Sequence, residues 1–335
     1  MTQESPAHCA PPVKPLDGHV HIVGTGSGGT GCWLRLRGWR RPFARILLRH
    51  IGLPGSALAG DFDRIYVERL LAMVRSSSLG AVVILAHEKP HDERGVPHAG
   101  QGAFYVPNDY VLSLARRHSE FIPAVSIHPA RRDALEELER CLGAGAAMMK
   151  ILPNCQNIDC NSPAYQRFWE RIAEAKLPLL AHTGGEHTLP VLRSELAAPR
   201  TLTLPLECGV TVIAAHCGTQ SGLFDRDYFE QFVEMARHYP NLYGDNSAFN
   251  VPIRGRCVPE CLRGFLAGRI IHGSDIPVPV HGHFAWLNGT VDWASFRRWE
   301  KHSNVLERDF QLKRAMGFGL ETFTRLHGLL RCSGT

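Results

Sequence analysis

Near the start of the sequence, His19 and His21 are separated by one valine in a short apolar run. Residues i and i+2 of a β-strand point to the same face, so both imidazoles can reach one metal ion if this run is a strand. Later apolar runs end in His182, His216 and Asp275. Imidazoles together with a carboxylate suit zinc or a similar divalent ion. The pattern predicts a metal site, provided that the fold brings the ends of these runs together.

Eight short apolar runs could supply the strands that position these residues. Continuous apolar runs without alternation are typical of parallel strands buried on both faces. Helix-like segments lie between them, and polar residues at successive run ends follow one another at intervals of about 30 residues, the length of one βα unit. The expected strands are 16–23, 81–88, 121–129, 146–153, 178–185, 210–217, 241–247 and 269–275.

Eight alternating βα units predict an α/β fold, a (β/α)₈ TIM barrel. We expect a single domain over residues 1–335, with the barrel core at about 16–328 and a C-terminal helix at 304–328. Two long loops, 24–61 after the first strand and 276–302 after the last, are expected on the face where barrel strands end. There they could cover an active site.

The composition is that of an ordinary globular protein, with 44% hydrophobic and 21% charged residues. A net charge of +5 gives no indication of nucleic-acid binding, and no apolar run reaches the ~18 residues of a membrane span. The ten scattered cysteines are interpreted as free thiols of a cytoplasmic protein. An arginine-rich stretch at 32–50 is interpreted as a solvated basic surface, with attraction of an anionic substrate as the alternative.

The order of these residues resembles the amidohydrolase superfamily. It runs from the His-x-His pair through a lysine in the fourth expected strand and histidines in the fifth and sixth to an aspartate in the eighth. The segments LDGHVH, MMKILP, LLAHTG, VIAAHCG and IIHGSDIP look most like its amidohydrolase-related (amidohydrolase 2) branch. That branch contains metal-dependent hydrolases, lactonases and non-oxidative decarboxylases. The resemblance covers residues from about 16 to 280 and is not specific for substrate.

By position, the resemblance implies that His19, His21, His182 and Asp275 bind the metal, and that Asp275 also takes a proton from the activated water. His216 resembles either a ligand to a second ion or a catalytic acid/base. Lys150 is either a carboxylated lysine that bridges two ions or an ordinary buried lysine. The cofactor is expected to be one or two divalent ions, with zinc favoured.

Other polar residues near the expected strand ends are candidates for substrate binding or for structural hydrogen bonds. Those that we assign to substrate binding are Glu186, His187, Asn154, Asn246 and His281. The expected partner is a small-molecule substrate, with association of copies through outer helices left open, and neither nucleic acid nor a membrane is expected.

The site predicts a hydrolase in which a metal-activated water attacks a cyclic amide, lactone or ester. A decarboxylase of a small aromatic or related acid, using one ion and His216, is the alternative among enzymes. A barrel that only binds a small molecule is the third interpretation. The complete set of four histidines and Asp275 argues against it, because simple binding does not need a water-activating carboxylate.

Overall fold

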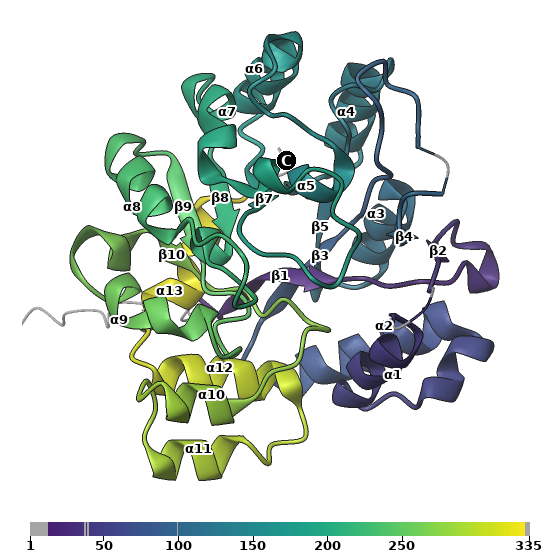
Figure 1. Ribbon diagram of the computed structural model, residues 1–335. Coiled ribbons are helices and arrows are strands. Elements are labelled where there is room, and N and C mark those ends of the chain that lie inside the picture. The colour runs from purple at the N-terminus through teal and green to yellow at the C-terminus, as the bar shows by residue number, and fades with distance from the viewer. Residues whose placement is uncertain (1–12, 37, 39, 99, 332–335) are drawn as a thin grey trace, which may run out of the picture.

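The computed structural model describes residues 13–331 except 37, 39 and 99. Within these residues, eight parallel strands form one sheet in the order β1-β3-β5-β6-β7-β8-β9-β10, a nearly closed (β/α)₈ barrel (Figure 1). The strands are β1 Leu16–His21, β3 Ala81–Leu85, β5 Phe121–Val125, β6 Met148–Ile151, β7 Leu179–His182, β8 Val212–Ala215, β9 Leu242–Asp245 and β10 Ile270–Ile271.

Backbone hydrogen bonds join the first strand to the segment at and after the last one. The amide of Gly18 donates to the carbonyl of His272 at 2.9 Å, and that of Asp275 donates to His19 at 2.8 Å. Gly273 allows this approach, because a Cβ there would lie 2.7 Å from the Cβ of His19. The closure therefore places Asp275 beside the His-x-His pair.

Helices surround the strands, as Figure 1 shows. Their bounds are α1 Arg40–His50, α2 Phe62–Arg75, α3 Asn108–Arg117, α4 Ala134–Gly143, α5 Pro153–Gln156, α6 Gln166–Glu174, α7 Thr203–Glu207, α8 Phe229–His238, α9 Val258–Cys261, α10 Gly282–Leu287, α11 Trp293–Trp299, α12 Val305–Ala315 and α13 Leu320–Thr324. A two-stranded antiparallel sheet pairs β2 Trp33–Leu34 with β4 Phe104–Tyr105. None of the helices in the described part of the chain is long and apolar enough to cross a membrane.

Alternate residues of the strands supply two separate apolar cores. In β3, Val83 and Leu85 belong to a cluster inside the barrel, whereas Val82 and Ile84 belong to the larger cluster between strands and helices. This alternation follows from the period of two in a strand. Leu326, in a 3-10 turn near the C-terminus, packs into the inner cluster. Side chains therefore fill the barrel below the face that carries the site.

All eight expected strands are present, but most end several residues earlier than predicted. The expected single helix at 304–328 is wrong in detail, because α12 ends at Ala315 and α13 begins only at Leu320. Between them Gly317 has φ +106°, a conformation that ends a helix. The two long loops also contain helices of their own, α1 in the first and α10 and α11 in the second.

Candidate functional site

The C-terminal ends of five strands meet at one face of the barrel and carry the predicted metal-site residues. Parallel barrel strands all end at the same face, so residues distant in sequence become neighbours there. The residues lie within β1 (His19 and His21), within β6 (Lys150), at the end of β7 (His182), directly after β8 (His216) and shortly after β10 (Asp275).

His19, His21 and Asp275 form the centre of this group. Asp275 Oδ1 lies 3.3 Å from His19 Nε2 and 3.2 Å from His21 Nε2. The three ligand atoms all lie within 4.8 Å of one another. Two ligand atoms bound tetrahedrally to zinc at 2.0–2.1 Å are about 3.3 Å apart. The donor set and its spacing therefore fit a divalent ion.

His182 offers a fourth nitrogen. Its Nε2 is buried and has no hydrogen-bond partner among the described residues. Glu186 Oε2 lies 3.8 Å from it, which is too far for a hydrogen bond. A buried unpaired polar atom is costly, so an ion here would satisfy it. Burial holds the pKa of His182 well below its usual value and lowers that of His19 to about 4. Both imidazoles are therefore neutral at pH 7, as metal ligands must be.

Asp245, which the sequence analysis missed, positions His19. This fully buried residue ends β9, and its Oδ2 lies 2.8 Å from His19 Nδ1. Its other oxygen accepts the amide hydrogens of His216 and Ser247. A carboxylate on Nδ1 fixes the tautomer in which Nε2 is free to bind a metal. The signal in the sequence is its place at a strand end, directly before Asn246.

His216 lies beside the three-residue centre. Its Nε2 is 3.8 Å from Asp275 Oδ2, and Ser247 Oγ contacts its Nδ1 at 2.7 Å. Both His216 and Asp275 have positive φ, +61° and +66°. Such conformations are uncommon for residues other than glycine and concentrate at functional sites. The turns that follow β8 and β10 therefore hold these two side chains in unusual but defined positions.

Lys150 is buried, and its Nζ lies 3.1 Å from His19 Nε2. Burial lowers the pKa of this lysine to about 8, although nearby carboxylates favour the charged form. The amine therefore loses its proton more easily than an exposed lysine would. It also lines the pocket described next, so its position is compatible with contact to a substrate.

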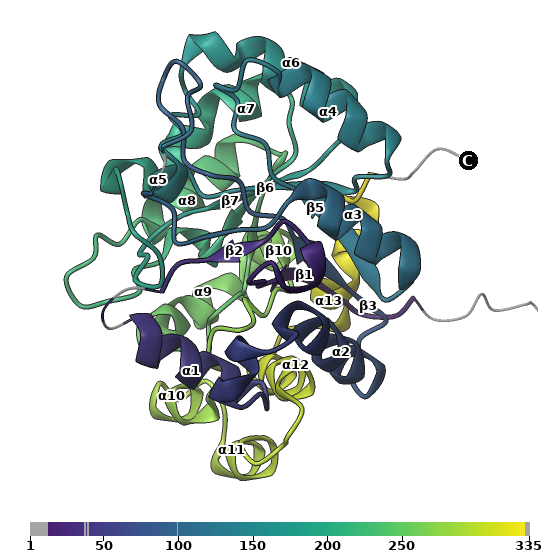
Figure 2. The same cartoon turned by 90° about the vertical axis from the view of Figure 1, so that its right-hand side faces the viewer.

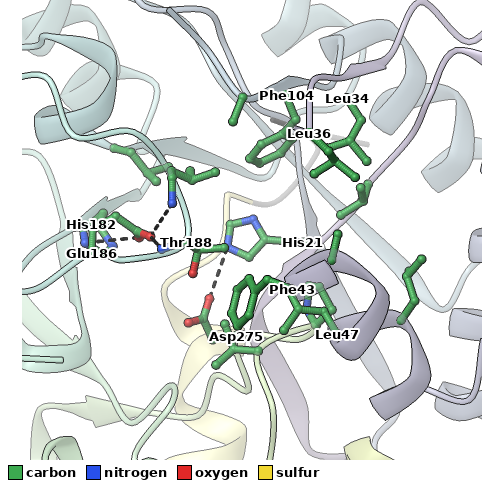
Figure 3. A pocket seen from close by; sticks show the side chains of 18 of the residues that line it. His21, Leu34, Leu36, Phe43, Leu47, Phe104, His182, Glu186, Thr188 and Asp275 are labelled. Carbon is green, nitrogen blue, oxygen red and sulfur yellow. Dashed lines mark hydrogen bonds and ion pairs between the residues drawn. The ribbon is translucent and has the colours of Figure 1, made fainter. Parts of the chain in front are cut away.

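A cavity of about 130 Å³ opens above these residues. Its floor is polar, and much of its wall comes from the long segment after β1, whereas the segment after β10 contributes only Pro277 and Val278. In Figure 3, His21 and Asp275 face each other, while His182 and Glu186 lie together to one side. The apolar wall residues include Leu34, Leu36, Phe43, Leu47, Phe104, Pro277 and Val278.

The five expected substrate-binding residues are placed differently from one another. Glu186 lines the cavity, and burial raises its pKa. His187 is 59% exposed and bonded to Asp225, while His281 lies beside Glu300. Asn154 and Asn246 are buried. These four are not among the residues that line the cavity within the described chain.

A second, open groove of about 970 Å³ adjoins the cavity and shares Leu34, Leu36 and Leu58 with it. Its lining includes exposed arginines and, within the described residues, no carboxylate. Three of the arginines follow one another at intervals of four along α1, so they share one helix face. The arginines are Arg35, Arg41, Arg45 and Arg49.

Comparison with known proteins agrees with this fold. No curated protein matches the chain. An uncharacterized TIM-barrel protein from Bordetella bronchiseptica is 18% identical with a TM-score of 0.56, covering 90% of this chain and 99% of its own. A probable 2-pyrone-4,6-dicarboxylic acid hydrolase from Acinetobacter baumannii, with citric acid bound, is 13% identical with a TM-score of 0.51, covering 91% and 100%.

A family model described as Amidohydrolase (Amidohydro_2) matches residues 84–307, about two thirds of the chain. The matched region includes His182, His216 and Asp275, whereas His19 and His21 precede it. The site geometry adds these two residues, because they contact Asp275 directly. The chain belongs to the amidohydrolase family of enzymes.

Proposed function

We propose that this enzyme is a metal-dependent hydrolase that cleaves a C–N or C–O bond in a cyclic amide, lactone or ester. The observation that carries the proposal is the convergence of His19, His21 and Asp275, with ligand atoms within 4.8 Å of one another, below a largely apolar cavity. An apolar cavity with a few convergent polar groups is the usual form of a small-molecule site.

His19, His21, His182 and Asp275 would hold the ion, with zinc favoured by three imidazoles and one carboxylate. When bound, such an ion lowers the pKa of a water to about 7 and polarises a carbonyl oxygen. Asp245 keeps His19 in the required tautomer through the 2.8 Å contact to Nδ1. The apolar walls exclude bulk water, which strengthens the electrostatic interactions inside.

Asp275 is the proposed proton acceptor. Burial raises its pKa, but the adjacent His19 and His21 outweigh this, so the pKa lies below its usual value and the carboxylate is ionised. Its Oδ2 faces His216 Nε2 at 3.8 Å, a gap that a reacting group could bridge. In the hydrolase, His216 orients the substrate carbonyl or passes the proton on to the leaving group.

The cavity and the groove together suggest the form of the substrate. A small apolar body fits the cavity, and a negatively charged group fits the arginine-lined groove that shares its wall. Like charges at intervals of four on a helix repel one another, by ~0.2–0.5 kcal/mol per pair. An anionic group in the groove would relieve this repulsion along α1.

Decarboxylation is the second candidate. His216 lines the cavity, and its Nε2 lies 3.8 Å from Asp275 Oδ2, so with a single ion bound it would be free to protonate a substrate carbon. Lys150 is compatible with both reactions, since an ordinary lysine can bind a substrate carboxylate and a carboxylated one can bridge two ions.

The test is turnover of a panel of lactones, cyclic amides, esters and aromatic acids in water enriched in ¹⁸O. A hydrolase incorporates ¹⁸O into the product, whereas a decarboxylase releases carbon dioxide without doing so. His19→Ala and Asp275→Ala should abolish turnover while circular dichroism shows a folded barrel. Full activity in both variants would disprove a metal-dependent reaction at this site.

The number of ions at this site is measured separately. The zinc bound per chain is compared between the wild type and a His19→Ala, Asp275→Ala double variant. A loss of two ions supports a carboxylated Lys150 and His216 as a ligand. A loss of one leaves His216 free for acid/base chemistry. A loss of none contradicts the proposed ligands.

A further inference from the structure

A second His-x-His pair lies in the segment after β10, outside the site described above. His281 directly precedes α10, His283 is within it, and Glu300 directly follows α11. Glu300 Oε1 lies 3.3 Å from His281 Nδ1 and 3.1 Å from His283 Nδ1, and the three ligand atoms lie within 4.8 Å of one another. The histidines are 41% and 56% exposed and Glu300 16%.

This group repeats the arrangement of the main site. There, Asp275 Oδ1 lies 3.3 and 3.2 Å from two histidine nitrogens. In both groups one carboxylate oxygen contacts both members of a His-x-His pair, at separations expected for ligand atoms around one ion. In the second group the histidines face the carboxylate with Nδ1, whereas those of the main site face it with Nε2. Solvent can reach the remaining coordination positions of an ion bound there.

The surroundings of Glu300 leave one oxygen available to a ligand. Its Oε2 accepts the amide hydrogen of Gly282 at 2.5 Å, so Oε1 faces the histidines. Burial raises the pKa of Glu300, but the contacts with His281 and Gly282 outweigh it and keep the carboxylate ionised. A nearby cation, Arg308, donates instead to the carbonyls of Val280 and His302.

We propose that His281, His283 and Glu300 form a second metal site, which binds zinc or a similar transition-metal dication with water completing the coordination. Two imidazoles and one carboxylate are suited to such ions, whereas magnesium and calcium prefer oxygen ligands alone. The site is independent of the proposed reaction, because none of its residues lines the cavity.

An ion here would join the two ends of the α10–α11 segment. His281 also packs against His50 at the end of α1, with ring centroids 5.0 Å apart, and His50 Nε2 accepts the amide hydrogen of Val280. Figure 2 shows α1 and α10 lying one above the other. The ion would therefore stabilise the contact between the two segments that wall the cavity.

The test is zinc titration of the chelator-treated full chain, followed by elemental analysis. A His281→Ala, His283→Ala double variant should bind one zinc ion fewer than the wild type, with affinity for that ion at least ~100-fold weaker. The exposed His238→Ala is the matched control and should bind as many ions as the wild type. Equal zinc content and affinity in the double variant and the wild type would overturn the proposal.

Two further measurements locate the ion. Crystals soaked in zinc should show an anomalous difference peak between His281 Nδ1, His283 Nδ1 and Glu300 Oε1, and no peak there would contradict the site. A His19→Ala, Asp275→Ala variant should keep this ion. Its loss in that variant would also overturn the proposal, because the two sites would then not be independent. Failure of the catalytic proposal alone would leave this result unchanged.

Discussion

The substitution Asp245→Asn keeps the shape of this side chain but removes the carboxylate that positions His19. In the wild type, Oδ2 lies 2.8 Å from His19 Nδ1, while Oδ1 accepts hydrogen bonds from the backbone amides of His216 and Ser247. Asparagine can keep its oxygen on the side of those two amides. Its NH₂ group then faces His19 Nδ1 and donates to it. The proton of His19 moves to Nε2, the atom proposed to bind the metal.

The size of the effect follows from this change of tautomer. Loss of a carboxylate partner from a metal-binding histidine typically costs 10–100-fold in metal affinity or activity. This corresponds to about 1.4–2.7 kcal/mol. The pKa of Asp245 is held below its usual value because hydrogen bonds and nearby histidines outweigh burial, so a charged acceptor is lost. We therefore expect zinc binding and turnover to fall together.

Zinc affinity is measured by competition with a chelator, and turnover at saturating zinc. Asp309→Asn is the matched control, because Asp309 is also fully buried but pairs with Lys313 at 2.7 Å instead of with a proposed ligand. It should lower stability without lowering zinc affinity. Unchanged zinc affinity in Asp245→Asn, with the fold intact, would refute the proposed role of Asp245.

Three further experiments test separate parts of the molecule. His182→Ala should weaken zinc binding at least ~100-fold by titration calorimetry; wild-type affinity would show that its unpaired Nε2 is not a ligand. Arg45→Glu with Arg49→Glu should raise KM for an anionic substrate about tenfold at low salt, and an equal rise for a neutral substrate would contradict a charge effect. Lys313→Met removes the cation that pairs with Asp309 and the donor to the carbonyl of Gly273. Burial already raises the pKa of Asp309 to about 7, so this carboxyl is then protonated, and urea denaturation should show a loss of about 1–3 kcal/mol. Lys313→Met with Asp309→Leu should recover most of that loss, and a loss below about 1 kcal/mol in the single variant would contradict the pairing argument.

Periodic features of the chain were predictable from the sequence. Eight apolar runs and the near-constant interval between strand-end polar residues predicted eight βα units, and the structure contains eight parallel strands at the predicted places. Because parallel barrel strands end at one face, the convergence of His19, His21 and Asp275 followed as well. Strand lengths did not follow, since apolar composition continues past the point where pairing between strands stops.

Contacts between distant segments could not be predicted from the sequence and became visible only in the folded chain. Asp245 and Asn246 are adjacent polar residues at one strand end, and only the register of β9 beside β8 and β10 places Asp245 on His19. In the same way, His281 contacts Glu300, 19 residues later, and does not line the cavity.

The barrel and the residue types at its catalytic face follow from the amino-acid sequence alone, because strand periodicity and βα spacing are local properties of the chain. The tertiary structure decided which carboxylate orients which histidine, and which parts of the long segments wall the cavity. Those outcomes depend on how independently formed elements pack, and a side chain's partner then lies far from it in sequence.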